Sequence, residues 1–307
     1  MKPRLLITLG DVAGIGPEIV AKAWTALHEW CDPIVIGDSH FLPASINVHN
    51  PSLVNLSNVP CGVATAVAGQ AAYEWVCYAI DECLAGRADA VVTCPIHKVG
   101  FQLAGLDFPG HTEVLAARTG APAHAMLLYD DALPLAVAHV TLHLELAQAV
   151  ASLTTEGVME KIELLAHMIP QLSGQPPRIG VGALNPHGSD GGRFGDAEAR
   201  IIAPAVAIMQ KRGFDVQGPI PADAIFLPST RSRFNGIVCM IHDHGHIPMK
   251  LLGGRRAVNV TAGLPIIRTS VAHGTAYDIV GKGQADESSL IAATRIAAQL
   301  AMQRTKC

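Results

Sequence analysis

Short apolar runs alternate with stretches of helical pattern along most of this 307-residue chain. Residues 4–9, 88–92 and 236–241 are short, aliphatic and bounded by Gly, Pro or polar residues, which favours buried strands. Residues 70–84 and 289–302 repeat their apolar side chains with the period of an α-helix. Because parallel neighbouring strands must be joined by a crossover, usually a helix, this alternation predicts an α/β fold with a largely parallel sheet.

Two stretches in the middle of the chain add detail to this prediction. Residues 125–129 and 135–140 read as adjacent strands, and residues 146–169 read as one long helical stretch. Gly157 lies within that stretch, and Gly disfavours a helix interior by about 1 kcal/mol relative to Ala. We therefore expect the helix to break at Gly157.

Composition limits the partners and the compartment that are expected. Hydrophobic residues make up 50% of the chain and aromatic residues only 5%, which indicates a large aliphatic core. No apolar run approaches the roughly 20 residues of a membrane helix, and residues 1–9 lack the long apolar region of a signal peptide. The net charge of -4 without a Lys/Arg cluster argues against nucleic acid. We therefore expect a cytoplasmic protein without a membrane or nucleic-acid partner.

Two polar segments follow predicted strands in the first part of the chain. Residues 10–18 are Gly-rich and precede a helix, whose free N–H groups favour anions, although a plain strand-to-helix turn explains them equally well. Residues 93–98 and 110–113 add His, Lys and Thr side chains that can hold an anion, with a solvated loop as the alternative. Since ligands bind at the carboxyl ends of strands in open α/β sheets, both segments are candidate parts of a binding site.

Two later segments carry candidate metal ligands. Residues 185–192 form a Gly-rich polar loop in which His187 is either a metal ligand or a surface side chain. Residues 241–250, expected as a loop after a buried strand, crowd together three histidines, an aspartate and a lysine. Burying such groups is costly without partners. Imidazole suits zinc, nickel or cobalt, and a site with three protein ligands leaves positions for substrate. These segments predict a catalytic metal centre.

In these segments the chain resembles the 4-hydroxythreonine-4-phosphate dehydrogenase family of pyridoxal phosphate biosynthesis and its catabolic relatives. The resemblance spans nearly the whole chain and keeps the order of the motifs. It is carried by Gly-Asp-x-Ala-Gly-Ile-Gly-Pro-Glu at 10–18, Gly-His-Thr-Glu at 110–113, Leu-Asn-Pro-His at 184–187, Pro-Ala-Asp at 221–223, His-Asp-x-Gly at 242–245, Val-Asn-Val-Thr at 258–261, Ile-Arg-Thr-Ser at 267–270 and His-Gly-Thr-Ala at 273–276. Each motif is short, and their combination is what is specific.

The resemblance implies an isocitrate/isopropylmalate-dehydrogenase-like fold, in which two α/β domains leave a cleft between them. We place the first domain at about 1–140 plus 265–307, and the second, with the metal-site loops, at 141–264. The resemblance also implies a homodimer with a shared active site. Three histidines from both subunits would bind one divalent metal ion there; by position in the motifs they are His143, His187 and His242. His139 competes with His143 for its role.

The remaining site residues are also assigned by the resemblance. It places around the small anionic substrate His111, Thr112, Asn259 and Arg268, and it places beside the metal Asp223 and Asp243. Lys250, or water linked to one of these aspartates, would take the proton from the substrate hydroxyl. NAD would accept the hydride, and zinc, or else Mg, Mn, Co, Ni or Fe, would stabilise the alkoxide. The residues that bind NAD and the choice between NAD and NADP stay open, because no Gly-x-Gly-x-x-Gly fingerprint occurs.

Departures from the biosynthetic pattern shape the expected substrate. They are Leu9, Val12, Cys94, His244, Ala272 and the pair Arg255 and Arg256. Guanidinium groups pair well with carboxylates. We therefore expect oxidation of a secondary alcohol with coupled decarboxylation, as in terephthalate cis-dihydrodiol dehydrogenase, which would yield protocatechuate. The alternatives are a dehydrogenase of 4-hydroxythreonine 4-phosphate or of a four-carbon sugar-acid phosphate, and an inactive homologue that binds only a metal or an anion.

Overall fold

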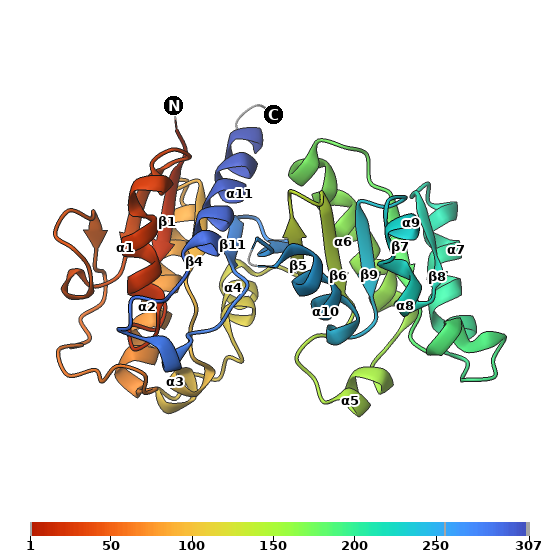
Figure 1. The fold of residues 1–307 in the computed structure, drawn as a ribbon, viewed down its shortest axis with the longest axis horizontal. Coiled ribbons are helices and arrows are strands. Elements are labelled where there is room, and N and C mark those ends of the chain that lie inside the picture. Colours follow the sequence, from red (N-terminus) through yellow and green to blue (C-terminus); the bar gives the residue numbers. More distant parts are fainter. Residues whose placement is uncertain (1, 255, 305–307) are drawn as a thin grey trace. The chain divides into compact units, whose positions relative to one another are not determined.

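Strands and helices alternate through the computed structural model, which describes residues 2–254 and 256–304. The chain divides into two units. Unit 1 consists of Met1–Pro122 and Val258–Cys307, and unit 2 consists of Ala123–Ala257. Each unit has its own strands with helices packed against them (Figure 1). The α/β class that the alternation predicts is therefore confirmed.

The strands of unit 1 are largely parallel. In spatial order β3-β2-β1-β4-β11-β10, they are β3 (Val48–His49), β2 (Asp32–Ile36), β1 (Arg4–Thr8), β4 (Ala90–Thr93), β11 (Ile267–Val271) and β10 (Val258–Ala262). β10 pairs with β11 antiparallel, and the other neighbours pair parallel. Ile7 on β1 and Val91 and Val92 on β4 are fully buried. Their aliphatic runs are continuous because helices cover both faces of such a sheet.

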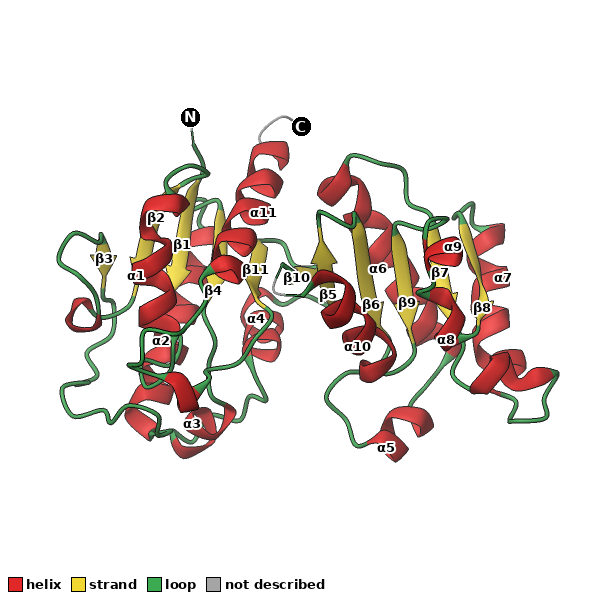
Figure 2. Ribbon diagram, viewed as in Figure 1, coloured by secondary structure: helices red, strands yellow, loops and turns green. Residues whose placement is uncertain are grey.

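Helices of unit 1 lie on both sides of these strands (Figure 2). They are α1 (Gly16–Leu27), α2 (Ala66–Leu84), α3 (Lys98–Leu103), α4 (His111–Thr119) and α11 (Ser288–Arg304), with short 3-10 turns η1 (Ser39–Phe41) and η4 (Tyr277–Ile279). α1 packs against α11, whereas α2 packs against β1 and β4 and contacts α3 and α4. The Thr65 hydroxyl fixes the start of α2 by accepting from the Ala68 N–H at 3.2 Å.

Unit 2 repeats the arrangement with a different set of elements. Its strands, in the order β5-β6-β9-β7-β8, are β5 (Ala125–Asp130), β6 (Leu135–His139), β9 (Gly236–Cys239), β7 (Ile179–Gly182) and β8 (Val216–Ile220). Its helices are α5 (Leu146–Ala151), α6 (Thr155–Ser173), α7 (Ala203–Lys211), α8 (Ala222–Ile225), α9 (Pro228–Arg231) and α10 (His242–Gly253), with short turns η2 (Pro186–Asp190) and η3 (Glu198–Ile202). β5 and β6 form an antiparallel pair, and the other pairs are parallel.

The structure corrects the prediction of a helix break at Gly157. The chain leaves the helix at residues 152–154, and Gly157 lies in the first turn of α6. Its N–H donates to the Thr154 hydroxyl at 3.0 Å, so Thr154 caps α6. A capping side chain just before the helix therefore decides the boundary, and the glycine is tolerated one turn later.

A second correction concerns residues 241–250, which form the start of α10 rather than a loop. α10 packs against β6 and β9, on the opposite face of the strands from α6 (Figure 1). Gly245 permits this approach, because a Cβ at that position would lie 2.3 Å from His139 Nε2. Within the described residues, no helix has the length and apolar character that crossing a bilayer requires.

Candidate active site

Hydroxyl side chains gather in unit 1 where β1, β4 and β11 end. The strand register aligns Thr8 with Thr93 and Thr93 with Ser270. Arg268 on β11 is only 3% exposed. Its Nη2 donates to Thr93 Oγ1 at 2.7 Å, and its Nη1 donates to Thr261 Oγ1 at 3.1 Å. Neutral hydroxyls therefore hold this guanidinium at the strand ends.

The positive charge of Arg268 is buried without direct pairing to a carboxylate in the part of the chain that the structure describes. Among residues 2–254 and 256–304, no acidic side chain forms an ion pair with Arg268, and its Nε has no hydrogen-bond partner. Burial lowers the pKa of Arg268 from 12.5 to about 10, and the charge of Glu113 opposes this shift only in part. A buried charge costs several kcal/mol unless a counter-ion pairs with it. The surroundings of Arg268 are therefore suited to an anionic ligand.

The other predicted substrate residues, His111, Thr112 and Asn259, also belong to unit 1. His111 and Thr112 form the first turn of α4, where backbone N–H groups lack helical partners. Burial, together with the charge of Arg268, lowers the pKa of His111 well below 6.5. Asn259 Nδ2 donates to the Val271 carbonyl at 3.3 Å. Within the part of the chain that the structure describes, His111 Nε2 and Asn259 Oδ1 are buried without hydrogen-bond partners.

The Gly-rich loop at 10–18 is tied to the segment that contains Tyr277. The buried Asp11 carboxylate accepts hydrogen bonds from the Ala13 N–H at 2.9 Å and from the Tyr277 hydroxyl. The His97 ring stacks on Tyr277 with ring centroids 4.7 Å apart. Burial raises the pKa of Asp11. Sequence reasoning did not single out Tyr277, because nothing in the chain's local pattern links it to Asp11.

Four histidines of unit 2 lie together where β6 ends and α10 begins. His242 and His246 are one turn apart on α10, and their rings stack with centroids 3.7 Å apart. His246 Nδ1 lies 3.1 Å from Nε2 of the buried His139. The ring centroid of His143 lies 5.9 Å from that of His242. The structure thus brings together the predicted ligands His143 and His242, and it adds His139 and His246 to them.

The protonation states in this histidine group suit metal binding. Burial lowers the pKa of His246 to about 4, and burial together with the neighbouring imidazoles lowers the pKa of His139 well below 6.5. Both rings are therefore neutral at pH 7, the form of imidazole that binds metals. Asp243 Oδ1 accepts from His242 Nδ1 at 2.6 Å, which lowers the pKa of Asp243. Nε2 of His242 is then the nitrogen available to an ion.

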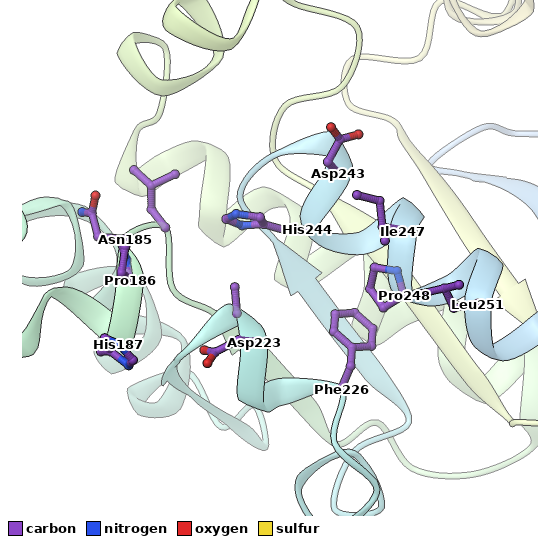
Figure 3. A pocket seen from close by; sticks show the side chains of 12 residues that line it. Asn185, Pro186, His187, Asp223, Phe226, Asp243, His244, Ile247, Pro248 and Leu251 are labelled. Carbon is purple, nitrogen blue, oxygen red and sulfur yellow. The ribbon is translucent and has the colours of Figure 1, made fainter.

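The third predicted ligand, His187, is not part of this group. It lines a pocket of about 540 Å³ together with Asp223, Asp243 and His244, and Figure 3 shows His244 projecting from α10 toward the segments that carry Asn185 and Asp223. No three His, Cys, Asp or Glu side chains among the described residues are placed to hold one ion. The donor types fit a transition metal, but one chain does not assemble the predicted trio.

The predicted catalytic residues Lys250, Asp223 and Asp243 are all exposed residues of unit 2. Lys250 follows His246 by one turn of α10. Its charge contributes, after burial and His242, to the lowered pKa of His246. Asp223 lies on α8 and lines the same pocket as His187.

A buried carboxylate supports the loop that carries His187. Glu198 is 4% exposed. Its Oε1 accepts from the N–H groups of Leu184 at 2.9 Å and Asn185 at 2.7 Å. Its Oε2 accepts from Asn185 Nδ2 at 2.9 Å and from the Ser189 hydroxyl. Burial alone would raise the pKa of Glu198, but these hydrogen bonds lower it below 4.5. Sequence reasoning missed Glu198, because its partners lie nine or more residues before it.

We expect Glu198→Gln to lower the free energy of unfolding by about 1 kcal/mol at pH 7, because hydrogen bonds to a charged acceptor are stronger than those to a neutral one. The folded state lowers the pKa of Glu198. Its charge therefore stabilises the protein above pH 4.5 and ceases to do so as the pH falls through the folded pKa. Urea unfolding of both proteins between pH 7 and pH 3.5 should show the difference narrowing below pH 4.5. A difference that stays constant would contradict this prediction.

Comparison with known proteins places the chain in a family. The family model described as "Pyridoxal phosphate biosynthetic protein PdxA" matches residues 29–297. The chain belongs to this family. It is 41% identical to 4-hydroxythreonine-4-phosphate dehydrogenase of Geobacter metallireducens, over 98% of this chain and 96% of that protein. It is 40% identical to D-threonate 4-phosphate dehydrogenase of Cupriavidus necator, over 98% of both proteins.

Solved structures of the PdxA family show the same fold. A crystal structure of 4-hydroxythreonine-4-phosphate dehydrogenase from Klebsiella pneumoniae matches with a TM-score of 0.85 and 36% identity, over 98% of both chains. The resemblance stated from the motifs and the prediction of a dehydrogenase are both confirmed.

The expectation of a terephthalate cis-dihydrodiol dehydrogenase, and with it a role in aromatic catabolism, is wrong. A crystal structure of such an enzyme from Burkholderia xenovorans is only 28% identical to this chain, with a TM-score of 0.67. The relatives near 40% identity are named for 4-phosphorylated substrates. Arg255 lies outside the described residues, and Arg256 donates to the Asp130 carboxylate at 3.4 Å. Arg256 thus already pairs with a carboxylate within its own unit, so its charge is no longer a reason to expect a dicarboxylate substrate.

Proposed function

We propose that this protein is an NAD- and metal-dependent dehydrogenase that oxidises the secondary alcohol of a four-carbon hydroxy acid carrying a terminal phosphate. The substrates that fit are 4-hydroxythreonine 4-phosphate and D-threonate 4-phosphate, for which its relatives are named. The observation that carries the proposal is Arg268, a buried guanidinium that forms no ion pair with a carboxylate of the described residues. A phosphate group would supply the missing negative charge.

Residues of unit 1 would bind the phosphate and the polar groups near it. Arg268 would donate through its unpartnered Nε, while Thr93 and Thr261 keep the guanidinium in place. The first turn of α4, with His111 and Thr112, would add backbone N–H groups and side-chain donors. Asn259 Oδ1, which has no partner among the described residues, would accept a hydrogen bond from a substrate hydroxyl or amine.

Residues of unit 2 would carry out the proton transfer. When bound, the metal would act as a Lewis acid that favours the alkoxide, and NAD would accept the hydride. His143 and His242 would be ligands from one chain, with Asp243 fixing the orientation of the His242 ring. Lys250, on the helix that carries His242, would take the hydroxyl proton. Asp223 would hold water beside His187 in the pocket of unit 2.

We propose that His187 completes the metal site of a second copy of the chain. His143, His187 and His242 do not form a three-ligand group among the described residues, so one chain leaves the trio incomplete. The pocket that His187 lines also carries exposed apolar side chains, with Ile247 55% and Leu251 81% exposed. Such a surface is typical of a subunit interface.

Complementation between two inactive variants tests this sharing of residues. We expect His143→Ala and His187→Ala homodimers each to lose metal-dependent turnover. Co-expression with two different tags should give heterodimers in which one of the two sites is intact, so about a quarter of the wild-type activity should return in an equal mixture. His143→Ala co-expressed with His242→Ala is the control and should stay inactive. Absence of recovery in the first pair would contradict a shared site.

The proposed activity itself is tested by NADH formation. We expect the protein to reduce NAD with 4-hydroxythreonine 4-phosphate, D-threonate 4-phosphate or both, to lose this activity with a chelator, and to regain it with a divalent ion. Zinc should be tried first, and then Mg, Mn, Co, Ni and Fe. A folded, metal-loaded protein that reduces NAD with neither substrate would overturn the proposal.

A further inference from the structure

The loop that carries His187 holds non-glycine residues in a left-handed backbone conformation. The φ angles are 53° at His187, 70° at Ser189 and 46° at Asp190. A left-handed conformation is unfavourable for side chains with a Cβ. Such a loop keeps this shape only if its surroundings determine it.

The Glu198 carboxylate holds the loop in this shape through hydrogen bonds to residues on both sides of His187. It accepts four hydrogen bonds. Three come from Leu184 and Asn185, which precede His187, and the fourth comes from the hydroxyl of Ser189, which follows it. Glu198 is itself fixed, because it begins the π-helical turn Glu198–Ile202, and π-turns of this kind are frequent at functional sites. Side chains at residues 184, 185 and 187 line the pocket of unit 2.

We propose that Glu198 is a positioning residue that holds the His187 loop in its strained conformation and so presents the His187 imidazole to its metal ion. This inference rests on the proposed role of His187. In this proposal Glu198 itself contacts neither the metal ion nor the substrate. Its two oxygens act as a template that favours one backbone path over the relaxed alternatives.

The test compares three variants of the protein, with His187→Ala as the reference for loss of the His187 ligand itself. Glu198→Ala removes all four acceptor contacts. Glu198→Gln can keep all four contacts with two of them reversed. Gln Oε1 accepts from both N–H groups, while its Nε2 donates to the Ser189 hydroxyl and to Asn185 after the Asn185 amide has turned over. Asp196→Ala is the matched control, since Asp196 is an exposed carboxylate two residues away that pairs with Arg200. Amide hydrogen exchange of residues 184–191 and Zn²⁺ affinity by competition with a chromophoric chelator are measured for each.

We expect Glu198→Ala to raise the exchange rate of this loop about tenfold or more and to weaken Zn²⁺ binding about 10- to 100-fold. Glu198→Gln should restore both quantities close to wild type, and Asp196→Ala should leave both unchanged. If Glu198→Ala does not fold, Ser189→Ala takes its place. It removes one of the four hydrogen bonds and should show a smaller change in the same direction.

The inference would be overturned if the alanine variant folds and the loop exchanges at the wild-type rate. It would also be overturned if exchange rises while Zn²⁺ affinity stays at the wild-type level, provided that His187→Ala lowers this affinity. A His187→Ala variant that binds Zn²⁺ as tightly as wild type refutes instead the ligand role in the proposed function. In that case the exchange rates still decide whether Glu198 fixes the loop.

Discussion

Replacing Arg268 by methionine should lower kcat/KM for a phosphorylated substrate about a thousandfold, which corresponds to about 4 kcal/mol. Arg268 is 3% exposed, and its Nε has no hydrogen-bond partner among the described residues. A charge-assisted contact between a guanidinium and a phosphate is strong when both groups are shielded from water. Methionine is a long side chain like arginine but carries no charge. Steady-state kinetics with the phosphorylated substrate and with its unphosphorylated counterpart measure the effect. Only kcat/KM for the phosphorylated substrate should fall by the full thousandfold.

The same variant should be at least as stable as wild type when no substrate is present. Removing an unbalanced buried cation ends a desolvation cost that the free protein bears. Thermal unfolding without ligand tests this, with Arg87→Met as the control because Arg87 is exposed and pairs with Glu82 at the surface. A clear drop in stability of the Arg268 variant would indicate that the charge serves the fold, and this would contradict its role as an anion receptor.

Lys250→Ala should lower kcat about a thousandfold and leave metal affinity nearly unchanged, since general-base catalysis contributes roughly 10²- to 10⁴-fold. Lys250 lies on α10, two turns beyond His242. The measurements are kcat and KM at several pH values and Zn²⁺ affinity. Lys211→Ala, a change at an exposed lysine of α7, is the control.

The alternative role for Lys250 is to grip an anionic group of the substrate. In that case Lys250→Ala would raise KM and leave kcat nearly intact. A parallel loss of metal affinity would show instead that the variant disturbs α10 and with it His242 and His246. Measuring kcat and KM on a metal-saturated protein therefore distinguishes a Lys250 that accepts the proton from a Lys250 that binds an anionic group of the substrate.

The sequence predicts the strands well because burial leaves a continuous aliphatic signature. Residues 88–92 read as a strand, and β4 spans Ala90–Thr93. Helix ends are less visible, as the Thr154 cap shows, because one hydroxyl can outweigh the intrinsic preference of Gly157. Residues 241–250 were expected as a loop because polar residues and Pro248 hide the helix. Helical spacing places His242 and His246 on one face, and that spacing is the signal that identifies His246.

The candidate site depends on contacts that no local pattern encodes. The motifs identify Arg268 and His111, but the lack of an ion pair at Arg268 within the described residues is visible only once β4, β10 and β11 are packed together. Arg256 illustrates the opposite error. Its charge suggested a carboxylate substrate, yet it donates to Asp130, which lies 126 positions earlier in the chain. Charge counted along a sequence therefore does not show which charges are already paired.

The most direct test of the proposed function is the ratio of kcat/KM for D-threonate 4-phosphate to kcat/KM for D-threonate, measured by NADH formation on the metal-loaded wild-type protein. The same ratio is measured for 4-hydroxythreonine with and without its phosphate. For at least one of these pairs we expect the phosphorylated compound to be preferred about a thousandfold, because in the proposed function the phosphate is the substrate group that balances the buried charge of Arg268. Ratios near one for both pairs, or faster oxidation of the unphosphorylated acids, would contradict the central claim.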